Sequence, residues 1–195
     1  MKNLKRILAL TLVASFLFTA SCSTSSRTRN HSDRDEDKEE DSGEDPEIYE
    51  TDWGTFEITH GWVYVPSQSN DEAYCFCEAG NEDSSTPPNN IVVRHGDNYY
   101  SPEESSTFAI AILDQVEQQA QQYGGTARME SSGTINGNDY YRFILDCTPY
   151  TEQYYFIGDH EFVMVGVCVY DEDEAEDDHI WDVSEDILNS FEWPD

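Results

Sequence analysis

The sequence predicts an α+β fold in which an antiparallel β-sheet has helices packed on its faces. Three observations support this. Asn136-Gly137 is a typical tight turn between two strand-forming segments. One long segment after Ser101 has apolar residues at helical spacing. The segment from Phe162 to Tyr170 is apolar on both faces apart from Gly166, so it needs a layer above and below the sheet.

Short strands are expected before the long helix. Apolar and polar residues alternate from Phe56 to Ile58, and Gly61 interrupts the pattern. In the segment from Ala73 to Glu78, Cys75 and Cys77 should lie on one face of a strand. The strands expected in this part of the chain are 56–58, 62–65, 73–78 and 91–94.

The long helix has clear signals at both ends. Ser101 is the expected N-cap, with Pro102 at the first helical position and Glu104 placed to complete a capping box. Gly124-Gly125 should end the helix. Its buried stripe is formed by Phe108, Ile112, Val116, Ala120 and Tyr123.

The second half of the chain should add four strands and a final helix. The expected strands are 129–135, 140–147, 153–157 and 162–170. Helical spacing of Ile180, Val183, Ile187 and Phe191 then predicts a C-terminal helix, which supplies the second layer.

Three motifs, taken in this order, resemble the PsbP/DcrB-like α/β sandwich. They are the opening Phe56-x-Ile58-x-x-Gly61-Trp62, the hairpin Asn136-Gly137-x-x-Tyr140-Tyr141, and the ending Ile187-Leu188-x-x-Phe191-x-Trp193. The resemblance covers nearly all of 51–195. It implies an accessory or binding protein, often tethered to a membrane, and it carries an architecture but no active residue.

The first residues predict a bacterial lipoprotein. A basic head precedes the apolar run Ile7 to Phe18, and the small residues Thr19-Ala20-Ser21 stand directly before Cys22. This layout resembles a lipobox, although Thr19 occupies the usual Leu position. It implies a signal peptide at 1–21 and fatty acids such as palmitate on Cys22. An ordinary secretory signal is an alternative; a transmembrane helix is another, but the run is shorter than the ~20 residues needed.

The chain therefore divides into three parts. After the signal peptide, residues 22–50 comprise the lipidated Cys22 and an acidic tether, which is expected to be disordered because it has few apolar residues to bury. Residues 51–195 are long enough for one domain with its own core. The expected location is the extracytoplasmic face of the cell membrane, with the lipid on Cys22 as the membrane contact.

The charge of the chain excludes one class of partner. Ten Lys and Arg residues stand against 41 Asp and Glu residues, which gives a net charge of −31. Such a chain repels phosphate backbones, so no nucleic-acid partner is expected. From Thr51 onward the only Lys or Arg residues are Arg94, Arg128 and Arg142. The protein or small-molecule partner is left open.

The cysteines of the domain leave several alternatives. Cys75, Cys77, Cys147 and Cys168 are candidates for disulfides of undetermined pairing, because an extracytoplasmic location permits them. Buried free thiols and a zinc site are the alternatives, but zinc knuckle spacing is absent. The acidic run 171–178 lacks the Gly and final Glu of an EF-hand loop. We therefore expect no metal and no cofactor.

No catalytic residue is expected. His60, His95, His160 and His179 match no H-E-x-x-H motif, and the chain contains no G-x-S-x-G. The first three adjoin a Gly or a turn and are expected to be exposed. The sequence thus predicts a non-enzymatic accessory or binding module at the cell envelope. A cell-envelope hydrolase and a solute- or cation-binding subunit associated with a transporter are the rival interpretations.

Overall fold

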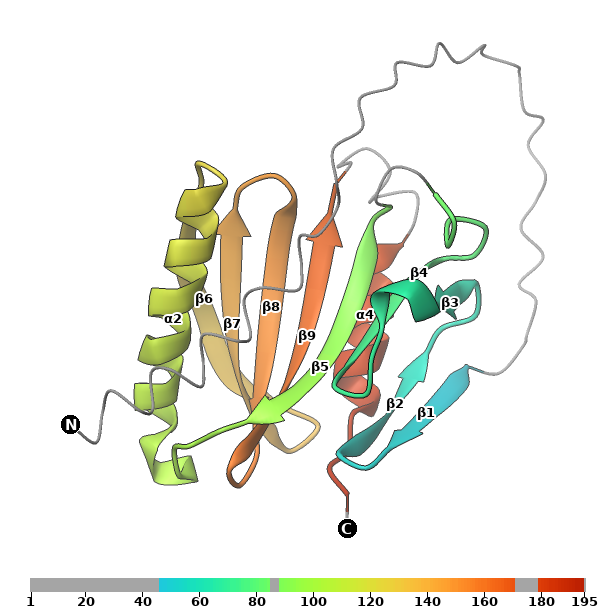
Figure 1. Ribbon diagram of the computed structural model, residues 1–195. Coiled ribbons are helices and arrows are strands. Elements are labelled where there is room, and N and C mark those ends of the chain that lie inside the picture. The colour runs from blue at the N-terminus through green and yellow to red at the C-terminus, as the bar shows by residue number, and fades with distance from the viewer. Residues whose placement is uncertain (1–45, 85–87, 171–178, 195) are drawn as a thin grey trace.

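The computed structural model describes residues 46–84, 88–170 and 179–194 (Figure 1). The predicted signal peptide 1–21, Cys22, the tether as far as residue 45 and the acidic run 171–178 lie outside the described residues. Within the described part, no helix has both the length and the apolar content needed to cross a bilayer.

The main layer is a seven-stranded antiparallel sheet with the order β3-β4-β5-β9-β8-β7-β6. Its strands are β3 (Trp62–Tyr64), β4 (Ala73–Glu78), β5 (Asn90–Asp97), β6 (Thr126–Ile135), β7 (Asn138–Asp146), β8 (Tyr150–Ile157) and β9 (Glu161–Val169). The predicted α+β fold is confirmed. The last three connections are simple hairpins, whereas β9 returns to pair with β5, so β9 becomes the centre of the sheet.

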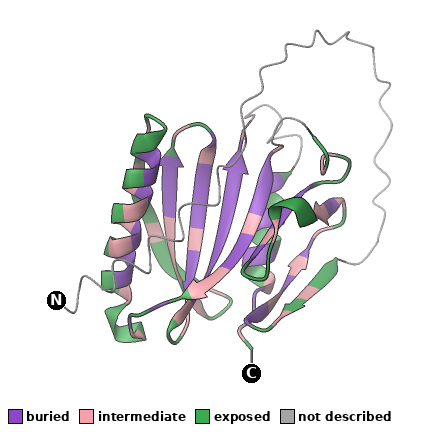
Figure 2. Cartoon of the chain, viewed as in Figure 1, coloured by how far each residue is buried: buried purple, intermediate pink, exposed green. Residues whose placement is uncertain are grey.

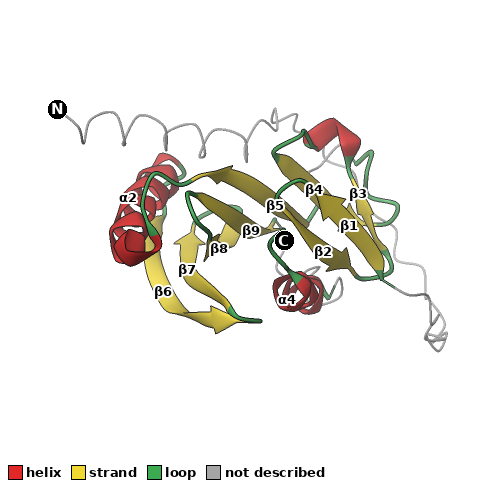
Figure 3. Cartoon of the chain, turned by 90° about the horizontal axis from the view of Figure 1, so that it is seen from below, coloured by secondary structure: helices red, strands yellow, loops and turns green. Residues whose placement is uncertain are grey.

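Two helices cover opposite faces of this sheet (Figure 3). The predicted capping box at Ser101 is formed, but it opens the short 3-10 helix η2 (Pro102–Glu104), and α2 follows as Ser105–Gln122. The C-terminal helix α4 (Ile180–Ser190) lies on the other face. A second 3-10 turn, η1 (Pro66–Gln68), precedes β4.

The predicted burial of β9 on both faces is confirmed. Every residue from Phe162 to Val169 is buried (Figure 2). Phe162 and Met164 pack under α2 with Phe108. The valines at alternate positions of β9 pack under α4 with Ile187. The sheet therefore separates two hydrophobic cores, and each helix seals one of them.

A first strand was not predicted, and the domain starts earlier than expected. β1 (Glu47–Thr51) pairs with β2 (Gly54–Ile58) in a separate two-stranded sheet. The tether prediction of 22–50 is thus wrong for its last residues, and β2 pairs with β1 rather than forming a hairpin with β3. The reason is a single aromatic anchor: the ring of Tyr49 stacks on Phe56 at 5.5 Å and meets Phe76 edge-on at 4.9 Å.

Candidate functional site

The α4 face of the sheet extends beyond the helix. The main contacts of α4 are with β2, β5 and β9. Strands β8, β7 and β6 lie farther along the sheet, beyond this contact region, and present polar and aromatic side chains on the same face. On β8, Tyr150, Glu152 and Tyr154 alternate with residues of the opposite face, and Phe156 continues the row into the α4 core.

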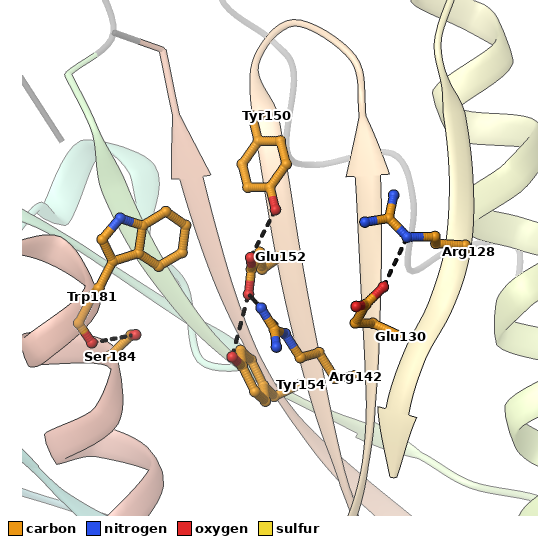
Figure 4. Close-up of polar contacts among 8 residues, drawn as sticks. All are labelled: Arg128, Glu130, Arg142, Tyr150, Glu152, Tyr154, Trp181 and Ser184. Atoms are coloured by element: carbon orange, nitrogen blue, oxygen red, sulfur yellow. Dashed lines mark hydrogen bonds and ion pairs between the residues drawn. The ribbon is translucent and has the colours of Figure 1, made fainter. Parts of the chain in front are cut away.

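Glu152 is the centre of this region (Figure 4). Its side chain is only 7% exposed. Arg142 of β7 donates to Glu152 Oε2 from Nε at 2.8 Å and contacts the same oxygen through Nη2 at 2.6 Å. Tyr154 also donates to Oε2, at 3.2 Å, and Tyr150 donates to Oε1 at 2.7 Å. Both carboxylate oxygens are therefore occupied, which a buried charge requires.

Strand register brings these groups together. Arg142 is the cross-strand partner of Tyr154, and Glu152 is the partner of Ile144. The Arg142 guanidinium consequently lies over the Tyr154 ring, 5.5 Å from its centroid, in a cation–π contact. Tyr140 lies next along β7, with its ring 6.1 Å from that of Tyr154.

The electrostatics fix the protonation of the cluster. Burial, assisted by the charge of Glu152, raises the pKa of Tyr154 to about 12 despite the opposing charge of Arg142. Burial and the hydrogen bond to Glu152 also raise the pKa of Tyr150. Burial alone lowers the pKa of Arg142, but the hydrogen bond and charge of Glu152 outweigh it, so the net shift is upward. Both tyrosines are thus donors and Arg142 is a cation at neutral pH.

Two further groups border the cluster. Trp181 of α4 meets the Tyr150 ring edge-on, with 6.3 Å between centroids. On β6, Arg128 donates from Nε to Glu130 at 2.8 Å, and both side chains are exposed. We call the surface formed by the residues of Figure 4 on β6, β7 and β8, together with Tyr140 and Trp181, the shelf.

The shelf combines paired charges with aromatic rings. Every cation on it is paired with a carboxylate, so it is locally neutral in a strongly anionic chain. The Arg142 guanidinium carries more N–H donors than its contacts with Glu152 use. Four aromatic residues of the shelf are half-buried and pack against the α4 core: Tyr140, Tyr150, Tyr154 and Trp181.

The four cysteines lie elsewhere, and all are free thiols. Cys75 and Cys77 share one face of β4, as predicted, while Cys168 lies on β9. Since β5 runs between β4 and β9, their Cα atoms are about 10 Å apart, and a disulfide needs less than about 7 Å. Burial raises the pKa of Cys75 and of Cys168 to about 12, so neither is a nucleophile at neutral pH.

The histidines are scattered over the domain. His60 and His160 are exposed, as expected. The expectation is wrong for His95, which lies within β5, stacks on Trp53 at 5.7 Å and contacts Glu161 at 2.9 Å. Among the described residues, no serine, threonine or cysteine side chain is hydrogen-bonded to His95, His160 or His179. Nor does the described part of the chain contain a group of three or more His, Cys, Asp or Glu residues that could hold a metal ion.

Sequence reasoning missed the shelf, although one signal was available. Tyr150, Glu152 and Tyr154 stand at every second position of a strand, so they must share a face. A carboxylate between two tyrosines, on a face otherwise destined for the core, needs a cationic partner. Only Arg94, Arg128 and Arg142 were available in the domain.

Comparisons with known proteins agree with the architecture. No family model matches the sequence, and no curated protein matches it. Among solved structures, cyanobacterial PsbP (CyanoP) from Synechocystis sp. PCC 6803 is similar, with a TM-score of 0.52 and 13% identity over 76% of this chain and 92% of that one. LpqN of Mycobacterium tuberculosis, which is involved in cell envelope biogenesis, has a TM-score of 0.53 and 14% identity over 80% of this chain and 88% of LpqN.

At these identities the likeness defines the fold. The domain is a PsbP/DcrB-like α+β sandwich, as the sequence predicts. The shelf lies beside the C-terminal helix of this sandwich, on the face that α4 covers only in part.

Proposed function

We propose that this protein is a lipid-anchored, non-enzymatic accessory or binding module at the extracytoplasmic face of the cell membrane. The observation that carries the proposal is the position of Cys22, directly behind Thr19-Ala20-Ser21 and an apolar run with a basic head. Two acyl chains on one residue give stable anchoring, whereas a single chain gives only reversible binding.

The chemistry of the domain supports a binding role. Its buried thiols are held protonated, and the carboxylate at the centre of the shelf already has all its partners. The similarity of the fold to LpqN is consistent with a place in the cell envelope. Of the two rival functions, the half-exposed aromatic rings of the shelf favour the solute-binding subunit over the hydrolase.

Lipidation is the step to test first. Cells expressing the full chain would be labelled with a clickable palmitate analogue, and membrane and soluble fractions compared. Cys22→Ala should abolish the label and release the domain or leave the precursor. Cys147→Ala removes a half-buried thiol of the domain and should change neither result. Normal labelling of the Cys22→Ala variant would contradict the anchor.

The location and the absence of catalysis need separate readouts. Protease added to intact spheroplasts should cut the anchored domain, because it lies outside the membrane. Fluorophosphonate probes, which react with activated serines, should leave the protein unlabelled. A labelled serine would contradict the non-enzymatic part of the proposal and would favour the hydrolase.

A further inference from the structure

We propose that the shelf binds a neutral polysaccharide chain of the cell envelope. This inference rests on the proposed function, because it names the ligand of the same binding module.

The charge balance selects a neutral ligand. Arg142 is neutralised by Glu152, and Arg128 by Glu130. A polyanion would meet no unpaired cation here and would be repelled by a chain of net charge −31. A polycation would have to compete with two guanidinium groups for the same carboxylates. A neutral ligand is not repelled by the net charge and does not compete with the guanidinium groups for the carboxylates.

The rings suit an extended ligand. Tyr150 and Tyr154 both direct their hydroxyls at Glu152 from opposite directions along β8, so the rings lie along the strand instead of projecting from it (Figure 4). Their Cα atoms are about 13 Å apart, since a strand rises about 3.3 Å per residue. Both rings lie between these Cα atoms, because their hydroxyls converge on Glu152, so the rings are closer together than the Cα atoms. With Trp181, whose ring is 6.3 Å from that of Tyr150, they form an aromatic surface that matches a chain of several sugar units better than a single sugar.

The polar centre excludes an apolar occupant. An apolar helix or lipid chain laid on the shelf would cover Arg142 and Glu152 completely and leave the remaining guanidinium N–H donors without partners. Sugar hydroxyls can accept from these donors while the C–H faces of the same rings stack on the aromatic groups. A polyhydroxylated chain therefore matches both halves of the surface.

The test uses the full chain purified in a polyoxyethylene detergent, because sugar-based detergents would compete. The probes are N-acetylglucosamine oligomers of increasing length and cello-oligosaccharides. Their binding is measured by calorimetry and by Trp fluorescence. We expect saturable binding that tightens with chain length up to the span of the shelf. Trp181→Ala should weaken it roughly three- to tenfold, the value of one aromatic contact.

Two further variants keep the test decisive. Tyr140→Ala removes a half-buried ring from the other side of the shelf and should weaken binding to a similar extent. It carries the test if Trp181→Ala does not fold. Tyr99→Ala removes an exposed tyrosine outside the shelf and should leave binding unchanged.

Several outcomes would overturn the inference. It is wrong if the folded wild-type chain binds no neutral saccharide, if Tyr99→Ala weakens binding as much as the shelf variants do, or if polyglutamate or polylysine binds there instead. Binding that is already maximal with a monosaccharide would indicate a free solute and not a polymer. If the wild-type chain is labelled by palmitate but binds no saccharide, the proposed ligand is refuted and the proposed lipid anchor is not. If Cys22→Ala is labelled normally, the lipid anchor is refuted and the ligand is not.

Discussion

Replacing Arg142 by methionine tests the central contact of the shelf. Met is unbranched and keeps the apolar stem of the Arg side chain but removes both contacts to Glu152 Oε2. In the native structure the Glu152 side chain is 7% exposed, and without Arg142 its only remaining partners are the hydroxyls of Tyr150 and Tyr154. The substitution therefore leaves a buried charge without its counter-ion.

The expected cost follows from burial. Breaking a fully buried ion pair from one side costs about 3–5 kcal/mol. Arg142 is 30% exposed, so solvent already screens part of the pair, and the tyrosine hydrogen bonds remain. We expect a loss of about 2–3 kcal/mol in the free energy of unfolding. For a domain of this size, that lowers the thermal midpoint by about 5–10 °C.

The assay is a double-mutant cycle by urea denaturation. Glu152→Gln keeps the shape of the side chain and removes its charge, so the double variant lacks the unpaired charge. We expect a coupling of at least about 1 kcal/mol between the two positions. Arg128→Met is the control, because its pair with Glu130 is exposed, and it should cost no more than about 0.5 kcal/mol. Additive effects of Arg142→Met and Glu152→Gln would refute this account of the cluster.

Three other predictions follow from burial and close packing. Burial raises the pKa of Cys75 to about 12, from an ordinary value near 9, so the folded state holds this proton more tightly than the unfolded state. The contribution of Cys75 to the free energy of unfolding should be fully present below about pH 9 and should be lost as the pH rises towards 12. In urea melts, Cys75→Ala should reduce this decline. Cys147 is the least buried of the four thiols and should react first with a disulfide reagent under native conditions, with that first phase absent in Cys147→Ser and not in Cys168→Ser. A Cβ on Gly96 would lie 2.6 Å from the Phe162 ring, so Gly96→Ala should cost about 1–3 kcal/mol in thermal melts, whereas an unchanged midpoint would show that the ring can move.

Local signals in the sequence were sufficient for most of the elements. β4 occupies the predicted Ala73–Glu78, and the C-terminal helix is found where the spacing of its apolar residues placed it. The apolar run of β9 correctly indicated a strand covered on both faces. These elements were predictable because side-chain periodicity within one segment determines which face is buried.

The missed features depend on contacts between distant segments. β1 follows an acidic stretch, and its place in the domain depends on Tyr49 meeting Phe76 of β4, which no local pattern reveals. The shelf depends on the register that sets Arg142 opposite Tyr154. Alternation along β8 shows which residues share a face, but it does not show where α4 stops covering that face.

The position of β9 between β5 and β8 also has a consequence for how the domain forms. Asn90 pairs with Cys168, so the middle of the sheet cannot close until the chain is nearly complete. Pairings between such distant segments slow folding, because a long loop must be ordered before any contact compensates for it. A chain that ends before β9 can pair β3-β4-β5 and β6-β7-β8, but it cannot join these two groups into one sheet. For the export that we propose, in which the chain crosses the membrane as an extended polypeptide, such a delay would keep the sheet open until the chain reaches the far side.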